Sequence, residues 1–98
     1  MTQSTKDVIE NRASVYGDYA LGVTLEAELL NLIETNYYNN NKAVMPHVHK
    51  LLISKIIMKL SRISVTTDHI DSWVDIAGYA ELTVKFLENE EYVCVKKT

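Results

Sequence analysis

Residues 55–79 read KIIMKLSRISVTTDHIDSWVDIAGY, and two lines of charge run through this otherwise apolar stretch. At about 100° per residue, the charges repeat on one stripe of each of two successive helices. The basic stripe consists of Lys55, Lys59 and Arg62, and the acidic stripe consists of Asp71, Asp75 and Gly78. Apolar residues flank the basic stripe, and an unpaired charge in such surroundings is costly. We therefore expect both stripes to meet a partner or a ligand.

The length and composition predict one globular domain that covers residues 1–98. A chain of 98 residues can form a single modest core. Hydrophobic residues make up 47% and charged residues 23%, which is typical of a folded protein. The net charge of -3 argues against general nucleic-acid binding, which usually requires a dominant basic surface.

Neither a signal sequence nor a membrane span is visible in the chain. Residues 1–7 are polar, and the longest apolar stretch, residues 51–60, is interrupted by Ser54, Lys55 and Lys59. The sequence therefore predicts a cytoplasmic protein without a membrane partner. Cys94 is the only cysteine, which excludes an intrachain disulfide and a cysteine-based zinc site.

Helix start and stop signals predict an all-α chain of four helices. The expected helices run from Lys6 to about Tyr16, from Asp18 to about Tyr37, from Pro46 to about Ser64, and, after a cap at Asp68, to about Glu90. The asparagine-rich segment from Asn36 to Lys42 is the one clear loop. Residues 92–95 alternate weakly, which is consistent with a short strand or a frayed tail. The default arrangement of four such helices is an antiparallel bundle.

The apolar residues of the last two helices are too many for such a bundle to cover. Between Pro46 and Ser64 they span about 140° of the helix, far more than one face. The last helix adds Trp73, Ile76, Val84 and Leu87. We therefore expect a homo-oligomer, a dimer or larger, because a second subunit is the natural cover for this surface. The alternative is a monomer in which the third helix is simply the central core helix.

Three motifs occur in a fixed order along the chain: Tyr16-Gly17-Asp18, Lys59-x-x-Arg62 and Asp71-Ser-Trp73-Val-Asp75-Ile-Ala-Gly78-Tyr79-Ala80. With these motifs, residues 11–87 resemble a family of small all-α proteins that is common in tailed phages and prophages and whose function is unknown. The resemblance implies a helical fold and a phage or prophage origin, and it brings no established activity.

A more distant similarity, in fold type and carboxylate-bearing helices, is to the MazG-like nucleoside triphosphate pyrophosphohydrolases. It implies an Mg²⁺-dependent enzyme in which Asp71 and Asp75 would be metal ligands. That family pairs Glu-x-x-Glu on one helix with Glu-x-x-Asp on another. Here Glu26, Glu28 and Glu34 are never three residues apart, and the two aspartates are spaced one residue too far.

The charged stripes predict binding of a phosphate-bearing nucleotide without requiring a reaction. The predicted ligand-binding residues are Lys59, Arg62, Asp71, Trp73, Asp75 and Tyr79. Lysine and arginine would hold the phosphate, an aromatic side chain would face the base, and an aspartate would contact a sugar hydroxyl, a base amine or Mg²⁺.

Two other readings compete with a nucleotide site. In the first, the basic and acidic stripes form a structural salt-bridge network that holds the last two helices together. In the second, the protein is an interaction module that uses its apolar surface to bind and modulate a host protein.

Overall fold

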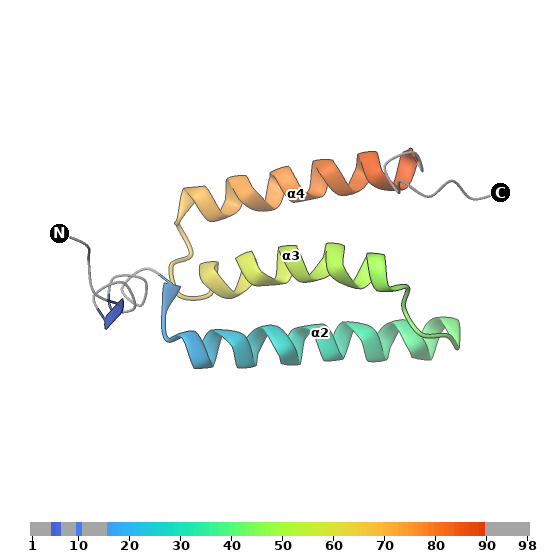
Figure 1. Cartoon of the computed structure of the whole chain (residues 1–98), viewed down its shortest axis with the longest axis horizontal. Helices are drawn as coiled ribbons and strands as arrows, with labels where there is room; N and C mark the ends of the chain where they lie inside the picture. Colours follow the sequence, from blue (N-terminus) through green and yellow to red (C-terminus); the bar gives the residue numbers. More distant parts are fainter. Residues whose placement is uncertain (1–4, 7–9, 11–15, 90–98) are drawn as a thin grey trace.

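Helices account for most of the chain that the structure describes. The computed structural model describes residues 5–6, 10 and 16–89, and within residues 16–89 it contains the helices α2 (Tyr19–Asn41), α3 (His47–Ile63) and α4 (Ile70–Glu88) (Figure 1). Strands are absent from this part of the chain. The all-α prediction is therefore confirmed for the described residues. The expected helix from Lys6 to Tyr16 and the segment 92–95 lie largely or wholly outside them.

Helix α2 has well-defined ends. Asp18 caps its start, because the carboxylate accepts a hydrogen bond from the backbone N–H of Leu21 at 3.0 Å. At the other end Lys42 adopts the left-handed conformation (φ 55°) and donates its N–H to the carbonyl of Tyr38. The predicted loop at 36–41 is wrong, since α2 continues through all of these residues to Asn41.

The bounds of α3 and α4 differ from the expected ones by one or two residues. Pro46 is the N-cap residue of α3 and does not lie in its first turn. The N-cap residue of α4 is His69, where the sequence favoured Asp68. The His69 side chain makes no capping hydrogen bond to the backbone; its Nδ1 lies 2.8 Å from the side-chain Oγ of Ser72.

The helices form one antiparallel layer with α3 in the middle (Figure 1). The side of α3 that faces α2 is marked by Ser61, whose Oγ donates to the carbonyl of Gly22 at 3.4 Å, and by Lys50. The side that faces α4 is marked by the ion pair between Lys59 and Asp75. Among the described residues α2 and α4 do not pack against each other, so α3 alone joins them.

The layer has two faces of different chemistry. On each helix, the residues about a quarter turn away from the contacts with the neighbouring helix point out of the layer. Because neighbouring helices run in opposite directions, their directions decide on which of the two faces these residues lie. The apolar face includes Leu21, Leu25, Leu29 and Leu32 of α2, Ile53, Ile56 and Leu60 of α3, and Trp73, Ile76, Val84 and Leu87 of α4; Glu28 interrupts the leucine row of α2. The charged face includes Glu34 of α2, Leu51, Lys55, Met58 and Arg62 of α3, and Asp71, Asp75, Gly78 and Leu82 of α4.

This arrangement is simpler than the bundle that we expected. Few side chains are buried in the described residues; the apolar ones are Met45, Ile57 and Ile63. No helix in the described part of the chain has the length and apolar character needed to cross a membrane.

Candidate functional site

The two charge stripes lie on the neighbouring helices α3 and α4, and one pair of their charges meets directly. Lys59 Nζ lies 3.0 Å from Asp75 Oδ2. The lysine side chain is only 9% exposed, whereas the aspartate side chain is 48% exposed. The ammonium group of Lys59 is therefore enclosed between the helices, and the more exposed carboxylate of Asp75 neutralises its charge. This contact holds α3 against α4, as the structural reading of the stripes predicted.

Arg62, one turn further along α3, does not join this ion pair. Its guanidinium carbon lies 4.5 Å from the centre of the Tyr16 ring, a cation–π geometry. Among the described residues no carboxylate lies within ion-pair distance of Arg62, and no side-chain hydrogen bond uses its N–H groups. Within the described part of the chain, the aromatic ring of Tyr16 is therefore the group that orients the Arg62 side chain.

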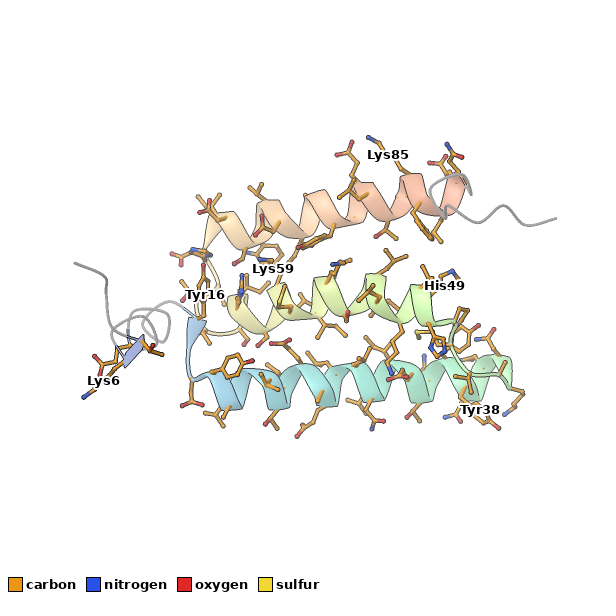
Figure 2. All side chains as sticks on the ribbon, viewed as in Figure 1. Lys6, Tyr16, Tyr38, His49, Lys59 and Lys85 are labelled. Carbon is orange, nitrogen blue, oxygen red and sulfur yellow. The ribbon has the colours of Figure 1, made fainter. Side chains whose placement is uncertain are left out.

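Tyr16 links three parts of the fold at one end of the layer (Figure 2). Besides Arg62 at the end of α3, its ring meets the ring of His69 edge-on, at 5.6 Å between centres, just before α4. His69 in turn contacts Ser72, whose side chain is fully buried. The sequence analysis did not include Tyr16, His69 or Ser72 in the site. The Tyr16-Gly17-Asp18 motif was the available signal for the first of them.

Gly17 brings Tyr16 to this position. Its φ of +82° lies in the left-handed region, and a Cβ atom there would come within 2.8 Å of Cγ2 of Val65. Only glycine fits both the conformation and the close approach to the connection between α3 and α4. Asp18 then starts α2 at once by capping it. The motif therefore forms a tight connection that places the Tyr16 ring against the end of α3.

Asp71 lies in the first turn of α4, on the charged face. Its side chain is exposed and makes no hydrogen bond or ion pair with another described residue. Because α3 and α4 are antiparallel, the turn of α3 beyond Lys59 and the turn of α4 before Asp75 lie at the same end of the layer. Arg62 and Asp71 therefore occupy the same region, although they are not an ion pair.

Tyr79 and Gly78 lie further along α4. The Tyr79 ring is half-buried, and Lys55 Nζ lies 5.8 Å from its centre, so a cation already occupies the neighbourhood of this ring. Beside Gly78 there is open space: a methyl group there would have no neighbour within 4 Å apart from the backbone of its own helix.

Trp73 is separated from the other predicted site residues. Its spacing from Asp75 puts it on the apolar face, and the residue is 49% exposed. Its Nε1–H donates to the carbonyl of Thr67 at 2.8 Å, which fastens the α3–α4 connection to the first turn of α4. The structure thus brings together Lys59 and Asp75, with Arg62 and Asp71 a turn away, and leaves Trp73 on the far side of the layer.

The described residues offer no ready metal centre at this location. Nowhere among them do three or more His, Cys, Asp or Glu side chains gather closely enough to hold a metal ion. A shallow hollow of about 280 Å³ lies at the opposite end of the layer; it is lined by Glu34, Thr35, Tyr38, Val44 and Met45. This hollow is separate from the charged residues at Arg62.

Comparison with known proteins gives a family and no activity. No curated protein and no solved structure matches the chain. The model of one family, described as a domain of unknown function (DUF6378), matches residues 1–87 and so spans every candidate site residue. The chain therefore belongs to the DUF6378 family.

Proposed function

We propose that the charged face binds a phosphate-bearing nucleotide and that Arg62 is its phosphate ligand. The observation that carries this proposal is the state of Arg62, which is held over the Tyr16 ring and lacks a carboxylate partner among the described residues. A guanidinium group offers five N–H donors in a planar fork that suits phosphate. Since its ring contact already limits its side-chain freedom, less entropy is lost when a phosphate binds.

Other residues at this end of the layer supply the remaining contacts of the proposed site. Asp71, exposed and without a protein partner among the described residues, is available to a sugar hydroxyl or a base amine. Lys59 contributes positive charge at short range, although Asp75 offsets it. Further along α4, the surface beside Gly78 is open, because a Cβ atom there would meet nothing within 4 Å apart from its own helix. The resemblance to phage proteins supports a phage or prophage origin as part of this proposal.

An Mg²⁺-dependent pyrophosphohydrolase is the alternative that uses the same site. It needs Asp71 and Asp75 as metal ligands together with carboxylates from another element. In the described residues Asp75 is engaged by Lys59 and no further carboxylate joins the two. The observation that favours the third class, an interaction module, is the exposed apolar face, and it concerns a different surface.

A binding experiment with a charge-matched control tests the proposal. Nucleoside triphosphates, cyclic mononucleotides and cyclic dinucleotides are titrated calorimetrically, with and without Mg²⁺, into the wild type, Arg62→Gln and Lys85→Gln. Lys85 is exposed near the end of α4 and pairs only with Glu81 among the described residues, so its loss removes the same charge far from the site. We expect at least one nucleotide to bind the wild type and Lys85→Gln equally, and Arg62→Gln at least about tenfold more weakly.

Two results would contradict the proposal. The first is that no nucleotide of these classes binds the wild type. The second is that Arg62→Gln binds as tightly as Lys85→Gln, which would assign the affinity to net charge alone. Release of pyrophosphate in the presence of Mg²⁺ would instead identify the enzyme.

A further inference from the structure

The three cations of the basic stripe differ in whether a carboxylate neutralises them. Lys59, in the middle of the stripe, is enclosed between α3 and α4 and lies 3.0 Å from Asp75. Lys55 and Arg62, on either side of Lys59, form no ion pair with any described residue. Within the described part of the chain, the stripe therefore consists of one paired cation between two unpaired ones.

Each unpaired cation lies beside an aromatic ring. Lys55 is exposed, and its Nζ lies 5.8 Å from the centre of the Tyr79 ring. The guanidinium carbon of Arg62 lies 4.5 Å from the centre of the Tyr16 ring. A cation–π contact of this kind limits the freedom of a long side chain and brings no negative charge to it. Both cations are therefore suited to hold an anion.

The two unpaired cations are two helical turns apart. Lys55 and Arg62 stand at positions i and i+7 of α3, which corresponds to about 10 Å along the helix axis. Both belong to the charged face, because this spacing returns to the same side of a helix. While each side chain stays beside its ring, a single phosphate group reaches only one of them. A ligand that uses both cations therefore needs two anionic groups.

The surface between the two cations is poorly suited to phosphate. Lys59 lies between Lys55 and Arg62 along α3, but Asp75 offsets its charge. The Asp75 side chain is 48% exposed, so this part of the surface presents a carboxylate that accepts hydrogen bonds. It repels a continuous chain of phosphates and favours a neutral group with O–H or N–H donors. The charges thus match a ligand whose two anionic groups are separated by a neutral part that carries donors.

We propose that the charged face binds a nucleotide with a phosphate group on each side of its sugar, and that Arg62 binds one phosphate and Lys55 the other. This inference rests on the proposed function and adds to it a second phosphate and a second phosphate ligand. A ribonucleoside 3′,5′-bisphosphate is a simple molecule of this class. Its hydrogen bonds to the two cations, each about 2.9 Å long, extend its reach at both ends, and its ribose hydroxyl is a donor for Asp75.

Two isomeric ligands test the need for separated phosphates. The 3′,5′-bisphosphate and the 5′-diphosphate of one ribonucleoside have the same atoms, and only the first has its phosphates on both sides of the sugar. The 5′-triphosphate carries a comparable charge on contiguous phosphates. All three are titrated calorimetrically for the four ribonucleosides, without Mg²⁺ and at constant ionic strength. We expect at least one bisphosphate to bind the wild type at least about tenfold more tightly than the other two ligands with the same base.

Three charge-matched variants locate the second phosphate. Lys55→Gln should abolish the preference for the bisphosphate, because it leaves only the position at Arg62. Arg62→Gln should weaken the binding of all three ligands. Lys50→Gln should bind as the wild type does, since Lys50 pairs with Glu34 on the side of α3 that faces α2. Circular dichroism must show wild-type helical content for a variant to count.

The outcomes separate this inference from the proposed function. If the wild type binds no bisphosphate more tightly than its isomer and the triphosphate, the inference is wrong, and this comparison needs no variant. It is also wrong if Lys55→Gln keeps the preference. In both cases, weaker binding of the diphosphates by Arg62→Gln would still support the proposed function. Absence of binding by every ligand would overturn both proposals.

Discussion

Two cations of the same stripe differ in their surroundings. Lys59 lies where α3 faces α4, so its ammonium group is enclosed and neutralised by Asp75. Arg62 lies one turn nearer the end of the helix, where a ring from outside the α3–α4 pair supports it. The spacing of Lys59 and Arg62 correctly predicted that they share a stripe. It could not show that, in the described part of the chain, the Lys59 charge is paired with a carboxylate of the neighbouring helix while the Arg62 charge is not. That distinction depends on Tyr16, which is distant in sequence.

Removal of Asp75 should destabilise the fold more than removal of Asp71. Asp75→Ala leaves the enclosed Lys59 ammonium without its partner, and we expect a loss of about 1–3 kcal/mol in the free energy of unfolding, less than for a fully buried pair because Asp75 is half-exposed. Asp71→Ala removes an exposed carboxylate at the start of the same helix and should cost about 0.3–1 kcal/mol through the helix dipole. Urea denaturation of both variants measures the difference.

A second substitution separates the charge effect from lost packing. Lys59→Met in the Asp75→Ala background replaces the stranded ammonium group by an apolar side chain of similar length, and it should restore part of the lost stability. If Asp75→Ala is no less stable than Asp71→Ala, the ion pair between α3 and α4 contributes nothing to the fold.

We expect a substitution by alanine to have opposite effects on stability at Gly17 and at Gly78. Gly17→Ala combines a left-handed backbone with a contact of 2.8 Å to Val65, so we expect a loss of about 1–3 kcal/mol and a weaker Tyr16–Arg62 contact. Gly78→Ala adds a methyl group to open space within α4 and should stabilise the protein by about 0.5–1 kcal/mol. Thermal unfolding of the two variants compares them directly. Equal effects on the melting temperature would contradict the role of Gly17 in holding Tyr16 against the end of α3.

At the scale of the elements, the sequence predicted α3 and α4 to within one or two residues. Both carry long runs of apolar residues at helical spacing, which is the most reliable signal. The end of α2 was missed because asparagine favours loops when only local preferences are considered. In the structure Asn40 and Asn41 donate their side-chain amides to the carbonyls of Asn36 and Tyr37, at 2.7 and 2.9 Å. Their polar groups are thus satisfied within the helix itself.

The contacts between elements were predicted less completely than the elements themselves. The Lys59–Asp75 pair follows from two stripes on consecutive helices, so it was predictable. The Tyr16–His69 contact joins residues on either side of α2 and α3, and no periodicity connects them. Gly22 lies where α2 meets α3, and a Cβ atom there would lie only 3.4 Å from Ser61 Oγ. Its small size lets α2 approach α3 closely without interrupting the helix.

For the whole molecule, the apolar excess of the sequence was identified correctly, but the expected bundle was not seen in the described residues. Helix patterns show how much apolar surface each helix carries, and they do not show which neighbours cover it. In the structure α3 packs against both neighbours, while α2 and α4 remain apart. The result is a layer with one apolar face and one charged face. The sequence predicts self-association, and we expect it to use the apolar face and to leave the charged face free for a ligand; this expectation is the central claim of this account.

The most direct test of that claim measures which leucines the wild-type protein hides from solvent. In the single chain Leu32 and Leu60 of the apolar face are exposed, as are Leu51 and Leu82 of the charged face. A soluble paramagnetic agent broadens the NMR signals of methyl groups that it can reach, and an interface excludes it. We predict that the methyl signals of Leu32 and Leu60 are protected, while those of Leu51 and Leu82 are broadened. Equal broadening of all four leucines, or protection of Leu51 and Leu82 instead, would contradict the account.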